Sequence, residues 1–203
     1  MTLAPDKAGE GANELADMDA VPVTEVNVGA TGTAADVRRR RAPTGGGGGI
    51  IQIVQTVVTA GDFTHNSETP TLITGMVASI TPKFTTSKIL VSMDVCTTTS
   101  NSNYTTMFFI YRDGSVVSGA RGDTGESNQL RCFKSVRHSG GNVPQNTSGM
   151  YLDSPSTTSS TTYQIYVAQE GGSTMYLNKF GSNSNVAYHP RVTSGITLME
   201  VSA

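Results

Sequence analysis

The chain has 203 residues, of which 36% are apolar and 15% charged, with 22 glycines, no tryptophan and a formal charge of −2. A near-neutral chain has no overall electrostatic attraction to nucleic acid, and the sequence lacks the apolar run of roughly 20 residues that membrane insertion needs. The length allows one domain plus an extension, and the abundance of Ser, Thr, Asn and Gly favours strands and turns over helices.

Residues 1–44 are predicted to form an extended N-terminal arm. The segment is rich in Gly and Ala and lacks aromatic residues, so by itself it buries too little apolar area to offset the entropy of ordering. It also lacks the basic and apolar segments of a signal peptide, so we expect synthesis in a cytoplasm. Four valines of the arm favour pairing as an extended strand with another chain. They are Val21, Val23, Val26 and Val28.

A basic run follows the valines, and its role stays open. One interpretation is a solvated charged patch, and the other is docking onto an acidic protein surface. Binding to nucleic acid and cleavage by a processing protease are weaker alternatives, because four residues are a short signal. The run consists of Arg38, Arg39, Arg40 and Arg41. With the four valines, these arginines are the candidate partner-binding residues of the arm.

Five glycines at 45–49 predict a flexible hinge, and residues 50–203 are predicted to form an all-β domain. The first strand covers 50–59, with Ile51, Ile53 and Val57 on one face and Val54 and Val58 on the other. Loops or polar turns are expected at 61–70 and 97–103. Further strands are expected at 71–80 (interrupted at Gly75), 88–96, 104–112, 130–136, 148–152, 161–168, 175–179 and 195–201.

Asp113-Gly114 between two apolar runs predicts a tight hairpin, because both central residues of that turn need positive φ. Nine or ten short strands, spaced about a dozen residues apart, predict an antiparallel sandwich or barrel. Cys96 and Cys132 both fall in predicted strands. Two thiols do not make a disulfide framework, so we expect both to be small buried hydrophobic residues.

No pattern in the chain predicts a catalytic, metal or cofactor site. The three histidines, His65, His138 and His189, are expected in solvated loops, and no His-x-His or Cys-x-x-Cys spacing supports a metal. Arg121-Gly122-Asp123, a tripeptide that binds some animal receptors, is interpreted as chance. A carboxylate pair for sugar hydrolysis stays open as a minor alternative. Its candidates are Asp94, Asp113, Asp123, Glu126, Asp153, Glu170 and Glu200.

Several tyrosines could contribute to recognition of a host-surface glycan, since they supply apolar faces with hydroxyl groups. A core position is an equally good interpretation for each of them. The tyrosines considered are Tyr104, Tyr151, Tyr166, Tyr176 and Tyr188, of which Tyr104, Tyr151 and Tyr188 are the candidate surface-recognition residues.

Four stretches of the β domain resemble structural proteins of tailed bacteriophages and related proteins of marine viruses. They are Ile51-Gln52-Ile53-Val54-Gln55-Thr56; Ser79-Ile80-Thr81-Pro82 with Thr86-Ser87-Lys88-Ile89-Leu90-Val91; Leu152-Asp153-Ser154-Pro155-Ser156-Thr157-Thr158 with Thr161-Thr162-Tyr163; and Ile196-Thr197-Leu198-Met199-Glu200-Val201. The resemblance does not extend to residues 1–44. It implies a jelly-roll-like sandwich, often trimeric, displayed on the particle as a fibre head, spike or capsid decoration, and it carries over no catalytic residues.

The sequence therefore predicts a non-enzymatic phage virion structural protein without a cofactor. Its arm is expected to dock on other virion proteins of the capsid, neck or tail, and its β domain to be displayed as a homotrimer. Within that class, a short fibre or spike head and a capsid decoration (cement) protein both stay open. The alternative is a carbohydrate-binding module or a glycan hydrolase that acts on host surface polysaccharide.

Overall fold

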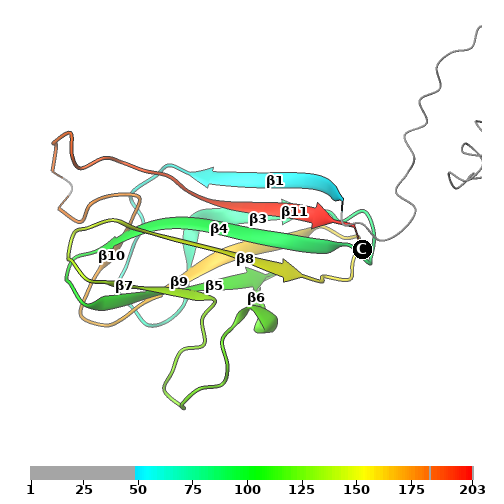
Figure 1. The fold of residues 1–203 in the computed structure, drawn as a ribbon, viewed down its shortest axis with the longest axis horizontal. Coiled ribbons are helices and arrows are strands. Elements are labelled where there is room, and N and C mark those ends of the chain that lie inside the picture. The colour runs from blue at the N-terminus through cyan, green and yellow to red at the C-terminus, as the bar shows by residue number, and fades with distance from the viewer. Residues whose placement is uncertain (1–48, 183, 203) are drawn as a thin grey trace, which may run out of the picture. The chain divides into compact units, whose positions relative to one another are not determined.

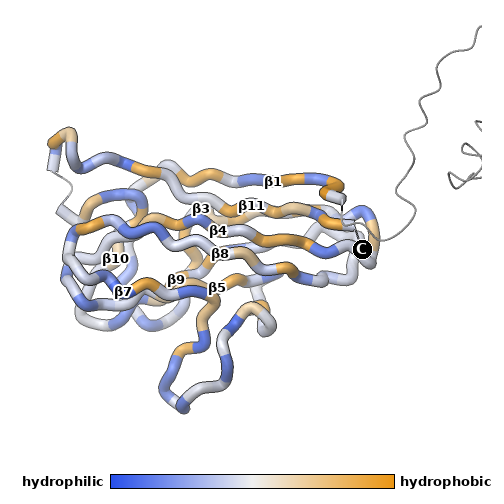
Figure 2. The backbone as a smooth tube through the Cα atoms, viewed as in Figure 1, coloured by the Kyte–Doolittle hydropathy of each residue, from blue (hydrophilic) through white to orange (hydrophobic). Residues whose placement is uncertain are grey.

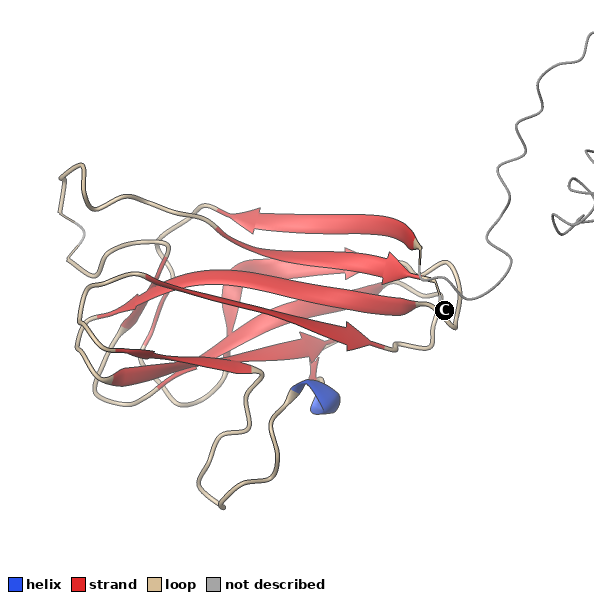
Figure 3. Ribbon diagram, in the orientation of Figure 1, coloured by secondary structure: helices blue, strands red, loops and turns tan. Residues whose placement is uncertain are grey.

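Eleven β-strands and one turn of 3-10 helix make up the part of the chain that the computed structural model describes, residues 49–182 and 184–202 (Figure 1, Figure 3). The predictions for residues 1–44 and 45–48 lie outside these ranges. The strands are β1 (Ile50–Val58), β2 (Thr64–His65), β3 (Thr71–Ile80), β4 (Lys88–Thr99), β5 (Tyr104–Arg112), β6 (Ser115–Val116), β7 (Lys134–His138), β8 (Gln145–Asp153), β9 (Thr161–Gln169), β10 (Met175–Leu177) and β11 (Ser194–Val201). The helical turn, η2 (Ser118–Ala120), follows β6.

The strands form two antiparallel sheets, which confirms the all-β sandwich. In one sheet β1, β11, β4 and β8 lie side by side, and β10 and β2 extend it beside the end of β4. In the other, β3, β9, β5 and β7 lie side by side, with β6 paired to the end of β5. Strands that follow one another along the chain therefore often lie in opposite sheets, in the strand order of a jelly roll.

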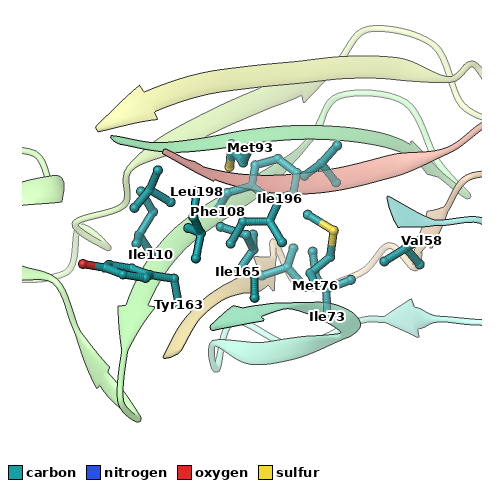
Figure 4. Packing of buried hydrophobic residues seen from close by; sticks show 14 of the residues in the cluster. Val58, Ile73, Met76, Met93, Phe108, Ile110, Tyr163, Ile165, Ile196 and Leu198 are labelled. Carbon is teal, nitrogen blue, oxygen red and sulfur yellow. The ribbon is translucent and has the colours of Figure 1, made fainter. Parts of the chain in front are cut away.

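The core lies between the two sheets and follows from strict alternation along the strands. On β4, Ile89, Val91, Met93 and Val95 are at most 1% exposed, because successive side chains of a strand point to opposite faces. Figure 4 shows how residues of both sheets interdigitate. Among them are Met93, Ile196 and Leu198 from the first sheet, and Met76, Phe108, Ile110, Tyr163 and Ile165 from the second.

Gly75 interrupts β3, as the sequence predicts. Its φ of +87° lies in the left-handed region, and the register of β3 against β9 shifts between Leu72 and Val77. This irregularity allows Ile73 and Met76, three residues apart, both to be fully buried. In a regular strand they would point to opposite faces.

The Asp113-Gly114 turn is confirmed. Both residues have positive φ, 48° and 78°, and the flanking residues Arg112 and Ser115 pair directly. This two-residue turn places Val116 back against Tyr111.

Three parts of the chain differ from the prediction. The loop expected at 61–70 contains the two-residue strand β2. The expected polar turn at 97–103 begins with buried strand, since β4 runs to Thr99 and its last three threonines are at most 1% exposed. Their β-branched side chains suit a strand, and the hydroxyls have partners: Thr98 Oγ1 donates to the Lys179 carbonyl at 2.6 Å. Residues 130–133 are not strand, so Cys132 lies in a loop and is only half-buried, whereas Cys96 is buried in β4.

Residues from the two ends of the described sandwich meet beside the start of β1. Ser202 donates its backbone N–H to the Gly49 carbonyl at 3.0 Å, and Gly49 N–H donates to Ser202 Oγ at 3.1 Å. The preceding 48 residues therefore connect to the sandwich at this point, which we call the entry end.

Candidate functional site

The candidate arm residues lie outside the part of the chain that the structure describes. The prediction that they bind a partner therefore stays a prediction. They are Val21, Val23, Val26, Val28, Arg38, Arg39, Arg40 and Arg41.

The three candidate recognition tyrosines do not form one site. Tyr104 begins β5 at the end of the sandwich away from the entry end, and its hydroxyl lies against Gly172. Tyr188 is 75% exposed and makes an edge contact with His189, with ring centroids 5.1 Å apart. Tyr151 lies on β8, packs its ring against the core and points its hydroxyl at Gly119.

Tyr151 lines a recess of about 370 Å³ at the entry end, formed by the β5–β6 turn, the following residues 116–119 and the end of β8. Arg112 and Asp153 also line it. Arg112 Nη1 forms a 2.6 Å ion pair with Asp153 Oδ2, and the Tyr163 hydroxyl donates to the same oxygen at 2.7 Å. No pattern in the sequence indicates this cluster, because its three residues come from three different strands.

The surroundings of the cluster keep the Tyr163 phenol protonated and the Arg112 guanidinium charged. Asp153 is 6% exposed and Tyr163 is fully buried. Burial raises the pKa of Tyr163, and the hydrogen bond to Asp153 raises it further, so the phenol remains a donor. Burial lowers the pKa of Arg112, but the hydrogen bond to Asp153, the charge of Asp153 and the interactions with Tyr163 together outweigh it and raise the pKa overall. The carboxylate therefore accepts from two fixed donors, an arrangement that stabilises the strand ends.

Three of the other candidate carboxylates also have local partners. Asp94 accepts from Asn146 Nδ2 at 2.6 Å, Asp113 from the Thr162 N–H at 2.8 Å, and Glu170 from the Thr105 N–H at 2.9 Å. Each contact joins neighbouring strands or closes a turn. These three carboxylates therefore hold parts of the fold together.

The histidines differ from the prediction that all three are solvated loop residues. His138 ends β7 and is fully buried, 3.3 Å from Thr106 Oγ1, and burial lowers its pKa. His65 lies in β2, and only His189 lies in an exposed loop. Among residues 49–182 and 184–202, no cluster of three His, Cys, Asp or Glu side chains could hold a metal ion. In the same ranges, no helix has the length and hydropathy of a membrane span.

The outer face of the β1-β11-β4-β8 sheet carries the most prominent apolar surface. A row of four apolar side chains crosses the sheet from edge to edge, since Ile53 pairs with Met199, Met199 with Leu90, and Leu90 with Leu152. Ile53 is 58% exposed and Leu152 45%. We call the row and the apolar side chains beside it the apolar face. It consists of Ile51, Ile53, Val57, Leu90, Met150, Leu152 and Met199.

The apolar face is concentrated on the two edge strands. On β1 it exposes Ile51, Ile53 and Val57, and Figure 2 shows the hydrophobic stretches along this strand. On β8 it exposes Met150 and Leu152. Strand β1 has no charged residue, and within the described ranges it pairs only with β11, so its other edge is open.

Edge strands normally carry charge, proline or a bulge that discourages pairing with other chains. Near its start, β1 has a register irregularity between Ile50 and Gln52, but the exposed positions from Ile53 to Val57 have none of these devices. A long, apolar and uncharged edge is therefore available for a partner. The sequence feature that indicates this exposed surface is the presence of apolar residues on both faces of the first strand, because only one of those faces is needed for the core.

No family model matches the chain, and no curated protein matches it. Among solved structures, three chains from infectious bursal disease virus are similar. The structure of the Gx strain gives a TM-score of 0.36 at 12% identity, covering 75% of this chain and 42% of that chain. The virus-derived T=1 particle gives 0.39 at 14%, covering 75% and 38%. The VP2 subviral particle gives 0.36 at 13%, covering 75% and 41%.

The present chain thus covers well under half the length of each of these chains. A likeness of this strength carries no information about what the present chain binds or assembles with.

Proposed function

We propose that this chain is a non-enzymatic structural protein of a tailed-bacteriophage virion, made in the host cytoplasm and assembled into the particle. Residues 1–44 dock on other virion proteins, and the sandwich is displayed at the surface as a short fibre or spike head or as a capsid decoration protein. The observation that carries the proposal is the uncharged apolar face, with its open β1 edge, next to the entry end of the sandwich.

The composition of this face favours a permanent partner over a transient one. Contiguous exposed apolar patches on soluble monomers are small, and larger ones mark interaction sites. Permanent interfaces are also more apolar than transient ones. The row Ile53–Met199–Leu90–Leu152 contains no charged or hydroxyl side chain, so water solvates it poorly until another subunit covers it.

We further propose that the partner is a second copy of this chain, within a homotrimer. The most exposed side chains of the apolar face lie on opposite edges of one sheet, Ile53 on β1 and Met150 on β8. In a closed ring each subunit uses two different surfaces, one toward each neighbour. The β1 side of one copy would then meet the β8 side of the next, and the open edge of β1 would be covered.

The proposal of a non-enzymatic role is supported by how the carboxylates are used. Glycoside hydrolysis needs two carboxylic groups facing a common space about 5–10 Å apart. Here Asp94, Asp113, Asp153 and Glu170 each accept hydrogen bonds from a different neighbour within the fold. Such contacts fix carboxylates in place as structural acceptors.

Deleting residues 1–44 tests the docking half of the proposal. Virions produced in cells that supply only the shortened chain should lack it, as measured by mass spectrometry of purified particles. The shortened chain should remain soluble, with the β-rich circular dichroism of the full chain. Normal incorporation of the shortened chain would overturn the role of the arm.

A further inference from the structure

A second recess lies on the outer face of the other sheet, beneath the excursion of residues 117–133 that leaves the sandwich after β6 and returns at β7 (Figure 1). Its volume is about 270 Å³, and it is lined by residues of β5, by Pro70 and by the excursion. This is just below the roughly 300 Å³ at which pockets for drug-sized ligands begin. The space therefore suits a ligand the size of one sugar ring.

The sheet contributes aromatic rings to this recess. Phe109 and Tyr111 line it. Phe109 lies directly opposite Tyr166 of β9 in the strand register, and Tyr111 stacks on Tyr166 with ring centroids 3.8 Å apart and planes 18° apart. Stacking fixes the orientation of Tyr111 beside the recess. A fixed aromatic surface of this kind can pack against the C–H face of a sugar ring.

The excursion contributes two guanidinium groups, Arg121 and Arg131. Arg121 Nε is buried and has no hydrogen-bond partner in the described part of the chain. Arg131 Nε donates to the Gly122 carbonyl at 3.0 Å, which holds the side chain and leaves its terminal nitrogens for other acceptors. Arg121 Nε is closed to solvent, so an anion in the recess would pair with the terminal nitrogens of the two guanidinium groups that line it.

The remaining polar groups restrict the chemical class of ligand that the recess can bind. Gln129 also lines the recess, and its amide oxygen accepts the Glu126 N–H at 3.1 Å, so its NH₂ group can donate to a hydroxyl. None of the lining residues is acidic. The exposed carboxylate of Asp123 lies within electrostatic reach of Arg131, and Glu126 is also exposed. Two carboxylates on the excursion disfavour a long polyanion, and a small anion held inside avoids them.

We propose that this recess binds a carboxylated sugar, with its ring against Phe109 and Tyr111 and its carboxylate between Arg121 and Arg131. Guanidinium groups are suited to this because they pair with carboxylates in a planar, bidentate geometry. None of these four residues was among the candidate recognition tyrosines or the arm residues, and Arg121 belongs to the tripeptide interpreted as chance. The site is independent of virion assembly, so its failure would leave the proposed function unaffected.

Saturation-transfer NMR on the full chain tests the site with D-glucuronic acid and N-acetylneuraminic acid as probes. The methyl ester of glucuronic acid has the same ring without the charge. We expect transfer from the acids, and an at least tenfold weaker response from the ester. Absence of transfer from both acids, or equal transfer from the ester, would overturn the proposal.

Two variants locate the binding. Arg121→Gln and Arg131→Gln should each weaken binding of the acids at least tenfold. The matched control is Arg137→Gln on β7, where Arg137 lies 3.6 Å from Glu170 and outside the recess lining. Arg131 belongs to the excursion and not to the core, so its variant should melt at the wild-type temperature. Unchanged binding by a folded Arg131→Gln would contradict the assignment.

Discussion

Gln52 and Glu200 face each other across the β1–β11 pair, where Gln52 Nε2 donates a 2.5 Å hydrogen bond to Glu200 Oε2. The other carboxylate oxygen accepts the backbone N–H of Lys83 at 2.6 Å, and Gln52 Nε2 lies 2.7 Å from the Thr81 carbonyl. Glu200 is fully buried. The carboxylate thus ties the edge strand β1 and the β3–β4 loop to the last strand, near the entry end.

Glu200→Gln is expected to lower the free energy of unfolding by about 1.5–3 kcal/mol at neutral pH, the range for hydrogen bonds to charged groups. Burial raises the pKa of Glu200, but hydrogen bonds, among them those from Gln52 and from the backbone N–H of Lys83, outweigh it and hold the pKa below 4.5. Because the folded-state pKa is lowered, the charged carboxylate contributes its full stability above the unfolded-state pKa of 4.5. This contribution is lost as the pH falls through the folded-state pKa.

Urea unfolding across this acid range would measure the effect. The wild-type free energy of unfolding should fall on acidification below about pH 4.5, and that of the variant should fall less steeply. Glu126→Gln, on the exposed excursion, is the control and should follow the wild type. Parallel curves for wild type and Glu200→Gln would show that this carboxylate is not the source of acid sensitivity.

Tyr163→Phe removes the hydroxyl that donates to Asp153, and should cost about 1.5–3 kcal/mol of unfolding free energy. Because the pKa of Tyr163 is raised above 10.0 by burial and by Asp153, its contribution is present below pH 10.0 and lost as pH rises further. A double-mutant cycle with Asp153→Asn should give a coupling energy of about 1 kcal/mol or more. Tyr188→Phe, at a 75% exposed position, should be neutral. Additive effects of the Tyr163 and Asp153 changes would contradict the proposed contact.

Gly75→Ala should destabilise the sandwich by about 1–3 kcal/mol, since a non-glycine residue at this positive φ is strained. An added Cβ would also lie 3.1 Å from Val58 Cγ2. Gly114→Ala is the matched control, because its φ is +78° but no atom lies within 4 Å of an added Cβ. Urea unfolding should therefore show a larger loss for Gly75→Ala. Equal losses would mean that Val58 moves freely and that crowding contributes nothing.

Ile53→Glu should dissociate the proposed homotrimer, because it places a charge in the middle of the apolar row. Val143→Glu is the matched control, because Val143 is an apolar residue 50% exposed in the loop between β7 and β8, outside the apolar face. Light scattering with size-exclusion chromatography would report a trimer for the wild type and the control, and a monomer for Ile53→Glu. A wild-type monomer, or a trimer that survives Ile53→Glu, would contradict an interface on this face.

Much of the fold could be predicted because strand alternation and turn chemistry are local. The Lys88–Cys96 alternation, the Asp113-Gly114 turn and the break at Gly75 all appear in the structure. The threonines at 97–99 were assigned to a turn because hydroxyl side chains suit both strands and turns. Their place in the core depends on partners such as the Lys179 carbonyl, which lies far away in sequence.

The candidate sites were less predictable, because each depends on pairing between distant strands. His138 could not be recognised as buried without knowing that β7 pairs with β5. The aromatic side of the recess beneath the excursion depends on the pairing of Phe109 with Tyr166. The Arg112–Asp153–Tyr163 cluster depends on three strands that meet at the entry end. Composition and spacing contain no information on these contacts.

The amino-acid sequence alone determined the all-β fold class, since period-two alternation and turn residues act within a few positions of one another. The sequence also determined which residues of the first strand share a face. Only the tertiary structure decided that Val54 and Val58 point inward and that Ile51, Ile53 and Val57 remain outside. Both faces are apolar, so burial was decided by which face the second sheet covers, and that depends on long-range strand pairing.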